Sequence, residues 1–321
     1  MEYLLFLQNL RESAPSVVND GILFLSEFMG GTGALAVMAL IYWCVSKWAG
    51  SFMLLNFSGA YMMNQTLKNI FCINRPYLRD SRLHPYTMET GYSFPSGHTM
   101  LGTAVYSSAA IWQKKHKWFV ALCAFLILLT AFGRNWIGVH TPEDVIVGIL
   151  VSLAVVFIQY RMLLWLEQKP EKDFWVLLCV IVWAAALLIL IPGSEKPCGI
   201  ILGVYFGWFV ERRWIRFEVK GNLISRILQY VLGMGFVLAM YKGLMPVLAR
   251  PFSENVQTLL INGFTFFTVT LLHSRLKPGC LYAAKKYSYK FLISNKVTST
   301  SISFIVIPYV RIIRLNLILL Q

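Results

Sequence analysis

Charged residues are scarce in this chain, and their scarcity excludes a soluble protein of this length. Of the 321 residues, only 14% are charged and 57% are hydrophobic, and the mean hydropathy is +0.60. Several stretches reach the roughly 18 to 20 apolar residues that cross a bilayer as one helix. The sequence therefore predicts an all-α fold, a polytopic transmembrane helical bundle.

Cysteine is also sparse, and its distribution argues against a disulfide framework or a zinc site. The six cysteines stand singly, at Cys44, Cys72, Cys123, Cys179, Cys198 and Cys280. Cys72 and Cys198 both fall near the predicted external face and could pair, but small apolar filler is the better interpretation for all six. Near the motifs described below, no histidines and carboxylates have metal-ligand spacing. We therefore expect neither a metal nor another cofactor.

A basic segment is missing from the N-terminus, so this end does not look like a cleaved signal peptide. Met1–Leu10 is apolar and carries Glu2. Its apolar residues could form one face of a short interfacial helix, and a helix packed against its own bundle fits the pattern at least as well. We assign residues 1–20 to a candidate interfacial segment that precedes the catalytic core.

Nine apolar stretches are candidate membrane spans. They lie at about 21–45, 51–70, 97–113, 118–137, 143–163, 174–192, 197–210, 223–246 and 256–273. A tenth apolar run, Ile302–Leu320, is interrupted by Arg311 and Arg314. The sequence therefore predicts a bundle of about nine spans.

The formal net charge of +14 is mainly a topology signal. Basic residues cluster in alternate loops, at 47, 114–117, 161–172, 212–220 and 275–290, while the loops between them carry most of the acidic residues. Because cytoplasmic loops hold the excess of lysine and arginine, the basic loops are predicted to be cytoplasmic and the N-terminus external. This distribution argues against nucleic acid as a partner, and it favours an integral-membrane protein surrounded by membrane lipids.

Three short segments hold the residues that point to chemistry. Together they supply three cations, two imidazoles, one carboxylate and a Ser-Gly pair: Lys68, Arg75, Ser96, Gly97, His98, Arg134, His140 and Asp144. The predicted topology brings all three segments to the external side, where positive charge favours an anionic ligand. Three cations could neutralise a transferring phosphoryl group, while one histidine attacks and the other protonates the leaving oxygen.

Each segment also has a plainer interpretation. Ser96 and Gly97 could simply begin a helix with His98 as a bystander, although a helix start is also an anion site. Asp144 could cap its own helix from the capping-box position, or it could orient the imidazole of His140. The cations could extend to lipid headgroups. All three segments in this order and at these spacings favour the chemical interpretation.

Over about residues 60–165, these segments resemble the signature of the type 2 phosphatidic acid phosphatase superfamily. The one departure is Gly133, where the family often has serine before the arginine. The resemblance implies that His140 is the nucleophile that forms a phosphohistidine, that Asp144 orients it, and that His98 protonates the leaving alcohol. It also implies metal-free binding of the phosphate oxygens by Lys68, Arg75, Ser96, Gly97 and Arg134.

We therefore expect an integral-membrane phosphatase that hydrolyses a lipid phosphomonoester or diphosphate at the external face of a bacterial cell membrane. Two alternatives stay open: a phosphotransferase that uses the same phosphohistidine, and a non-enzymatic lipid-binding or transport protein on this scaffold. We assign residues 21–165 to the catalytic helical core, residues 166–275 to additional transmembrane helices, and residues 276–321 to a basic cytoplasmic tail with an apolar end.

Overall fold

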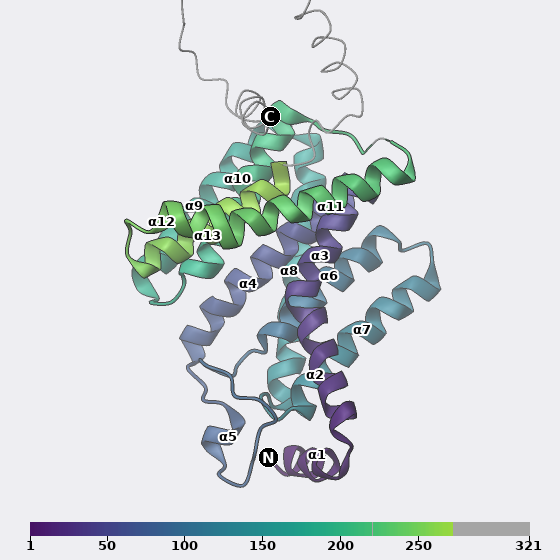
Figure 1. Ribbon diagram of the computed structural model, residues 1–321, viewed down its shortest axis with the longest axis vertical. Helices are drawn as coiled ribbons and strands as arrows, with labels where there is room; N and C mark the ends of the chain where they lie inside the picture. Colours follow the sequence, from purple (N-terminus) through teal and green to yellow (C-terminus); the bar gives the residue numbers. More distant parts are fainter. Residues whose placement is uncertain (220, 272–321) are drawn as a thin grey trace, which may run out of the picture. The chain divides into compact units, whose positions relative to one another are not determined.

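The computed structural model describes residues 1–219 and 221–271, and every regular element in them is a helix (Figure 1). This confirms the predicted all-α class. The described residues all belong to one compact unit, Met1–Leu276. The predicted cytoplasmic tail, 276–321, and its apolar run lie outside the described residues.

The helices follow one another with short connections, except for a long loop between α5 and α6. In chain order they are α1 (Glu2–Ser13), α2 (Ser16–Gly30), α3 (Thr32–Leu40), the π-helix η1 (Ile41–Val45), α4 (Lys47–Phe71), α5 (Pro76–Arg79), α6 (Gly97–Trp112), α7 (Lys117–Trp136), α8 (Pro142–Gln168), the 3-10 helix η2 (Pro170–Lys172), α9 (Asp173–Leu190), α10 (Glu195–Val210), the π-helix η3 (Glu211–Ile215), α11 (Leu223–Ala239), the π-helix η4 (Met240–Leu244), α12 (Met245–Ala249) and α13 (Glu254–Leu271).

Four helical stretches among the described residues are long and apolar enough to cross a membrane. They are Lys117–Trp136, Pro142–Gln168, Pro170–Leu190 and Leu223–Ala249, and the pair Ser16–Gly30 and Gly33–Val45, bent by 46°, could add a fifth. The chain is therefore an integral-membrane protein, as predicted, whereas the count of nine spans stays a prediction. Two of the remaining predicted spans, α6 and α10, have only 16 residues each.

Helix α4 lies inside the bundle, where it packs against α6, α8 and α10. Its apolar side chains Phe52, Leu54 and Leu55 are fully buried. The same helix buries polar groups, and the amide of Asn56 donates to the Ser108 hydroxyl of α6 at 2.9 Å. Polar residues are tolerated here because they bond within the bundle, so α4 is long but less apolar than a lipid-facing span.

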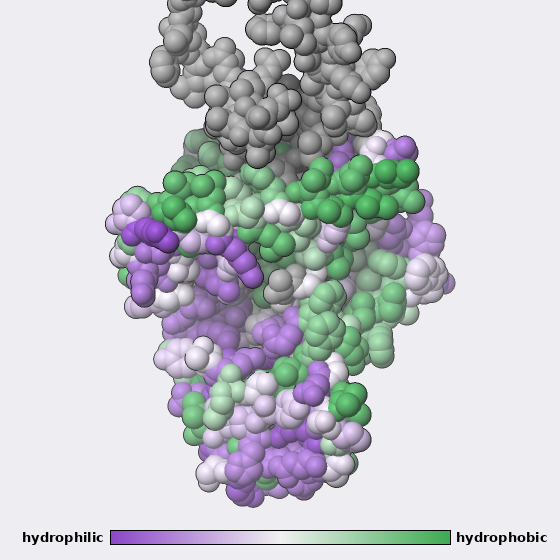
Figure 2. Space-filling model, in the orientation of Figure 1, coloured by the Kyte–Doolittle hydropathy of each residue, from purple (hydrophilic) through white to green (hydrophobic). Residues whose placement is uncertain are grey.

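Lipid-type surface covers the outer helices, and polar surface gathers at one end. On α7 and α8 the outward side chains are large and apolar, with Trp118 69% exposed and Phe157 63% exposed. Figure 2 shows many polar residues at the end that holds α1 and α5, further polar residues along one flank, and a broad apolar surface over α11 (Figures 1 and 2). The exposed apolar side chains on the outer helices are explained by contact with lipid, because lipid is as apolar as the interior of the protein.

Helix α1 packs one side against this polar end and leaves the other side exposed. Leu4 and Leu7 are buried, whereas Phe6 is 58% exposed. The buried Arg11 anchors the helix, because its Nη1 donates to the carbonyl of Trp136, at the end of α7, at 2.6 Å. The apolar pattern near the N-terminus thus has both an inward face and an outward face.

Candidate active site

The predicted site residues meet where α4 and α7 end and where α6 and α8 begin. The two helix starts are joined directly, because the Ser96 backbone N–H donates to the carbonyl of Asp144 at 3.0 Å. The end of α4 is attached to the same place through Asn64, whose amide donates to the Pro95 carbonyl at 2.9 Å. Segments that lie far apart in the sequence are thereby fixed around one point.

Ser96 and Gly97 begin α6, as predicted, although Ser96 does not cap it. Ser96 stands at the N-cap position and is fully buried, but its hydroxyl accepts a hydrogen bond from Thr99 at 3.0 Å instead of binding the helix N–H groups. The first-turn N–H groups are therefore left for another acceptor. At Gly97 an added Cβ would lie 3.2 Å from the Asn64 side-chain oxygen, so glycine allows α4 to approach closely.

Asp144 makes the contacts of both predicted roles: it caps its own helix, and it lies beside the imidazole of His140. It completes a capping box with Thr141, whose backbone N–H donates to Asp144 Oδ2 at 2.8 Å. The same oxygen lies 3.4 Å from Nδ1 of His140 and accepts the Ser93 hydroxyl at 2.5 Å. Ser93 was not among the predicted site residues, because it precedes Asp144 by 51 residues and belongs to no helix pattern.

His140 is almost completely buried, with 1% of its surface exposed. Its Nε2 lies 3.1 Å from Nη1 of Arg75, which is a permanent donor, so Nε2 acts as an acceptor there. The tautomer with the proton on Nδ1, facing Asp144, satisfies both contacts. Burial lowers the pKa of His140, against the opposing hydrogen bond to Asp144 and with help from nearby cations. The imidazole is therefore neutral at neutral pH, as a nucleophile must be.

Lys68 and Arg75 both hold the loop that leads into α6. Lys68 Nζ donates to the Tyr92 carbonyl at 2.7 Å. Arg75 donates to the carbonyls of Gly91 at 3.1 Å and Thr90 at 3.0 Å. The cations predicted to bind an anion thus have backbone oxygens as partners in this structure.

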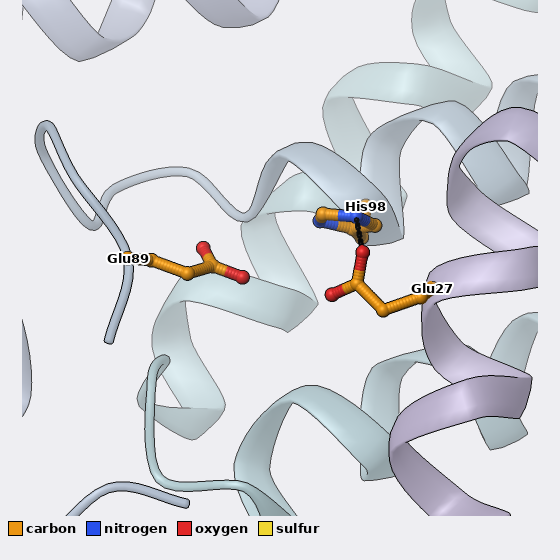
Figure 3. A group of neighbouring side chains, drawn as sticks. All are labelled: Glu27, Glu89 and His98. Carbon is orange, nitrogen blue, oxygen red and sulfur yellow. Dashed lines mark hydrogen bonds and ion pairs between the residues drawn. The ribbon is translucent and has the colours of Figure 1, made fainter. Parts of the chain in front are cut away.

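Two carboxylates outside the predicted set enter the same site, Glu27 and Glu89 (Figure 3). Glu27, on α2, pairs with Arg134 Nη1 at 2.6 Å and with His98 Nε2 at 2.9 Å. Glu89, in the loop before α6, pairs with Arg75 Nη1 at 2.9 Å and also contacts Arg134 Nη2. A signal for Glu27 was available, because a lone carboxylate inside an apolar stretch is costly unless it has a partner.

One group among the described residues has ligand atoms spaced for a metal ion. Ligand atoms of Glu27, Glu89 and His98 all lie within 4.8 Å of one another. The same carboxylates already pair with the guanidinium groups of Arg75 and Arg134, and those fixed positive charges repel a divalent cation. We interpret the group as an ion-pair network, and the expected independence from metal stays a prediction.

The chain belongs to the PAP2 superfamily. The family model described as PAP2 superfamily matches residues 47–168, and the one described as PAP2 superfamily phosphatase, transmembrane extension, matches residues 196–278. Together these segments make up more than half of the chain, and the first contains all eight predicted site residues.

Several curated relatives resemble the same part of the chain. Phosphatidylglycerophosphatase B of Bacillus subtilis is 30% identical over 35% of this chain and 56% of its own length. Phosphatidylglycerophosphatase B of Escherichia coli is 31% identical over 25% of this chain and 31% of its own length. Undecaprenyl-diphosphatase of Sulfolobus acidocaldarius is 25% identical over 46% of this chain and 71% of its own length. The chain thus spans about half or less of the two phosphatidylglycerophosphatases. No solved structure matches it.

Proposed function

We propose that the protein is an integral-membrane phosphatase that removes the terminal phosphate from a lipid phosphomonoester or diphosphate. One observation carries the proposal: the buried His140 has Asp144 beside Nδ1 and presents Nε2 to the Arg75 guanidinium. The relatives named as phosphatases of lipid phosphates support the substrate class. A site among helix ends, on a protein with an apolar exterior, suits a substrate whose phosphate arrives from the bilayer.

The reaction has two steps in this proposal. Nε2 of His140 attacks phosphorus, the bond from phosphorus to the leaving oxygen breaks, and His98 gives that oxygen a proton. His98 then takes a proton from water as that water attacks the phosphohistidine; the P–N bond breaks, inorganic phosphate leaves, and both histidines return to their starting state. Arg75 and Arg134 supply positive charge where the transferring group gathers negative charge, so the residues present can do this chemistry without a metal.

The proposal includes a location, namely the external face of a bacterial cell membrane. The argument is the alternation of basic loops, because Lys114, Lys115 and Lys117 connect the ends of α6 and α7 away from the site. By the positive-inside rule that loop is cytoplasmic and the site faces outward.

Phosphate release from a panel of lipid phosphates tests the function. Purified protein should release phosphate from at least one of phosphatidic acid, phosphatidylglycerol phosphate, an isoprenyl diphosphate and a sphingoid-base phosphate. Activity should survive EDTA and be inhibited by vanadate, which mimics the five-coordinate phosphoryl group. His140→Ala is the control and should be inactive.

Each of the other outcomes would indicate a different function or mechanism. Transfer of the phosphate to added glycerol in preference to water would indicate the phosphotransferase. Lipid binding without phosphate release from any substrate would indicate a binding or transport protein. Loss of activity in EDTA, restored by magnesium, would contradict the metal-free mechanism.

A further inference from the structure

Two partly exposed carboxylates pair with two buried guanidinium groups in this site. The guanidinium side chains of Arg75 and Arg134 are 3% and 0% exposed, whereas the carboxylates that pair with them, Glu89 and Glu27, are 21% and 45% exposed. The carboxylates can therefore turn toward water, while the guanidinium groups cannot. A buried guanidinium without an anion is strongly unfavourable, so the carboxylates leave only when another anion replaces them.

Arg134 has a donor that lacks an acceptor in the described part of the chain. Its Nε is buried and has no hydrogen-bond partner among the described residues. An unpaired buried donor costs free energy, and an anion larger than a carboxylate could satisfy it. A phosphate, with more oxygens than one carboxylate, fits this description.

Close helix packing brings Glu27 into the site. At Gly133, on α7, an added Cβ would lie 2.7 Å from Cβ of Ser26, the neighbour of Glu27 on α2. At Gly30, one turn further along α2, an added Cβ would lie 2.6 Å from the carbonyl oxygen of His98. This chain has Gly133 where the family often has serine. The absence of a side chain there allows α2, which carries Glu27, to lie close to α7.

We propose that Glu27 and Glu89 act as internal competing anions that select a doubly charged terminal phosphate against the singly charged phosphodiester headgroups of ordinary membrane lipids. This inference rests on the proposed function and names the selectivity of that same site. A dianion replaces both carboxylates and leaves the local charge unchanged. A monoanion that displaced both would leave the buried cations with one negative charge too few.

The exchange also releases the general acid. His98 Nε2 is paired with Glu27 in this structure. When a substrate phosphate binds Arg134, the ion pair between Glu27 and Arg134 breaks. Glu27 can then turn away from His98, and the Nε2 proton of His98 becomes available to the leaving oxygen. A lipid with a phosphodiester headgroup does not trigger this release, so the site is not occupied by the abundant lipids around it.

Binding of two matched probes tests the selectivity without turnover. The probes are dodecylphosphonate, a dianion above its second pKa, and its monomethyl ester, a monoanion with the same chain; their P–C bond is not cleaved by this mechanism. Calorimetric titration in nonionic detergent should show that the wild type binds the phosphonate at least tenfold more tightly than the ester. Glu27→Gln and Glu89→Gln should each strengthen ester binding severalfold more than phosphonate binding. Glu12→Gln, which removes an exposed carboxylate of α1, is the matched control and should change neither.

A further variant tests the same inference without changing either carboxylate. Gly133→Ser should push α2 away from Arg134, so it should lower the selectivity in the same direction as Glu27→Gln. Equal strengthening for both probes, an unchanged ratio in the variants, or a wild type that does not prefer the phosphonate would overturn the inference. Phosphate release measured in parallel separates the two ideas, because selective binding without hydrolysis contradicts only the proposed function.

Discussion

At the scale of single residues, the two histidines differ in their partners, and this predicts different defects. His140→Ala removes the nucleophile, so it should abolish both turnover and phosphoenzyme formation. His98→Ala should mainly slow the loss of a poor alkoxide leaving group, which needs a proton. With p-nitrophenyl phosphate, whose leaving group departs unprotonated, the His98 variant should recover a larger part of its lost rate, and the His140 variant none. Rapid-quench trapping with labelled substrate measures the phosphoenzyme, and its appearance in His140→Ala would mean that the roles are exchanged.

The buried imidazole of His140 also predicts a pH dependence. Because burial lowers its pKa, the side chain should stay neutral as the pH falls through about 6.5, where a free histidine takes up a proton. The unfolded chain binds that proton and the folded chain does not, so the free energy of unfolding should decrease as the pH falls through the same range. Histidine Cε1 shifts in a labelled protein, assigned with His140→Gln, measure the titration. A His140 resonance that titrates at or above 6.5 would contradict this prediction.

The spacing of nearby residues predicted part of the site. The other residues of the site are brought in by contacts between distant segments. The start of α8 at Pro142 and the nearness of Asp144 to His140 follow from a few adjacent residues, so a single sequence contains them. Ser93 lies 51 residues from Asp144, and no local pattern marks it. Glu27 lies 107 residues from Arg134, and its charge inside an apolar stretch indicates that it needs a partner without indicating which one. Tertiary partners of this kind are visible only once the helices are packed.

At the scale of helices, close contact between α10 and α13 depends on glycine. An added Cβ at Gly203 would overlap the backbone of Gly263, and one at Gly199 would lie 2.5 Å from the carbonyl oxygen of Leu259. Gly203→Val should therefore destabilise the fold by about 1 to 3 kcal/mol, because the backbones must separate. Gly235→Ala on α11 is the control: no atom lies within 4 Å of its added Cβ, so it should be neutral or slightly stabilising. Thermal unfolding in detergent measures both, and equal midpoints would argue against this packing.

Apolar length predicted the helices better than it predicted which of them face lipid. The sequence treats α4 and α8 alike as long apolar runs, yet α4 lies inside the bundle with Asn56 and Asn64 buried. Helix α8 instead exposes Leu150 and Phe157. A run of apolar residues cannot distinguish lipid from a neighbouring helix as its surroundings, because both are apolar.

At the scale of the whole molecule, the arrangement of charges predicts which side faces outward. In a variant without native cysteines, Met88→Cys, at a site 79% exposed in the loop before α6, should react with a membrane-impermeant maleimide in intact cells. Lys115→Cys, at the exposed turn between α6 and α7, should react only after the cells are opened. The reverse labelling pattern would place the site in the cytoplasm.

The tight contact between α2 and α7 has a consequence for the history of this protein. A side chain at position 133 would meet Ser26, so it would push the turn of α2 that carries Glu27 away from α7. The two positions should therefore covary: relatives with serine before the arginine should lack an acidic residue at the place of Glu27. An alignment of full-length homologues would show this as a correlated pair, and frequent sequences carrying both serine and glutamate would contradict it.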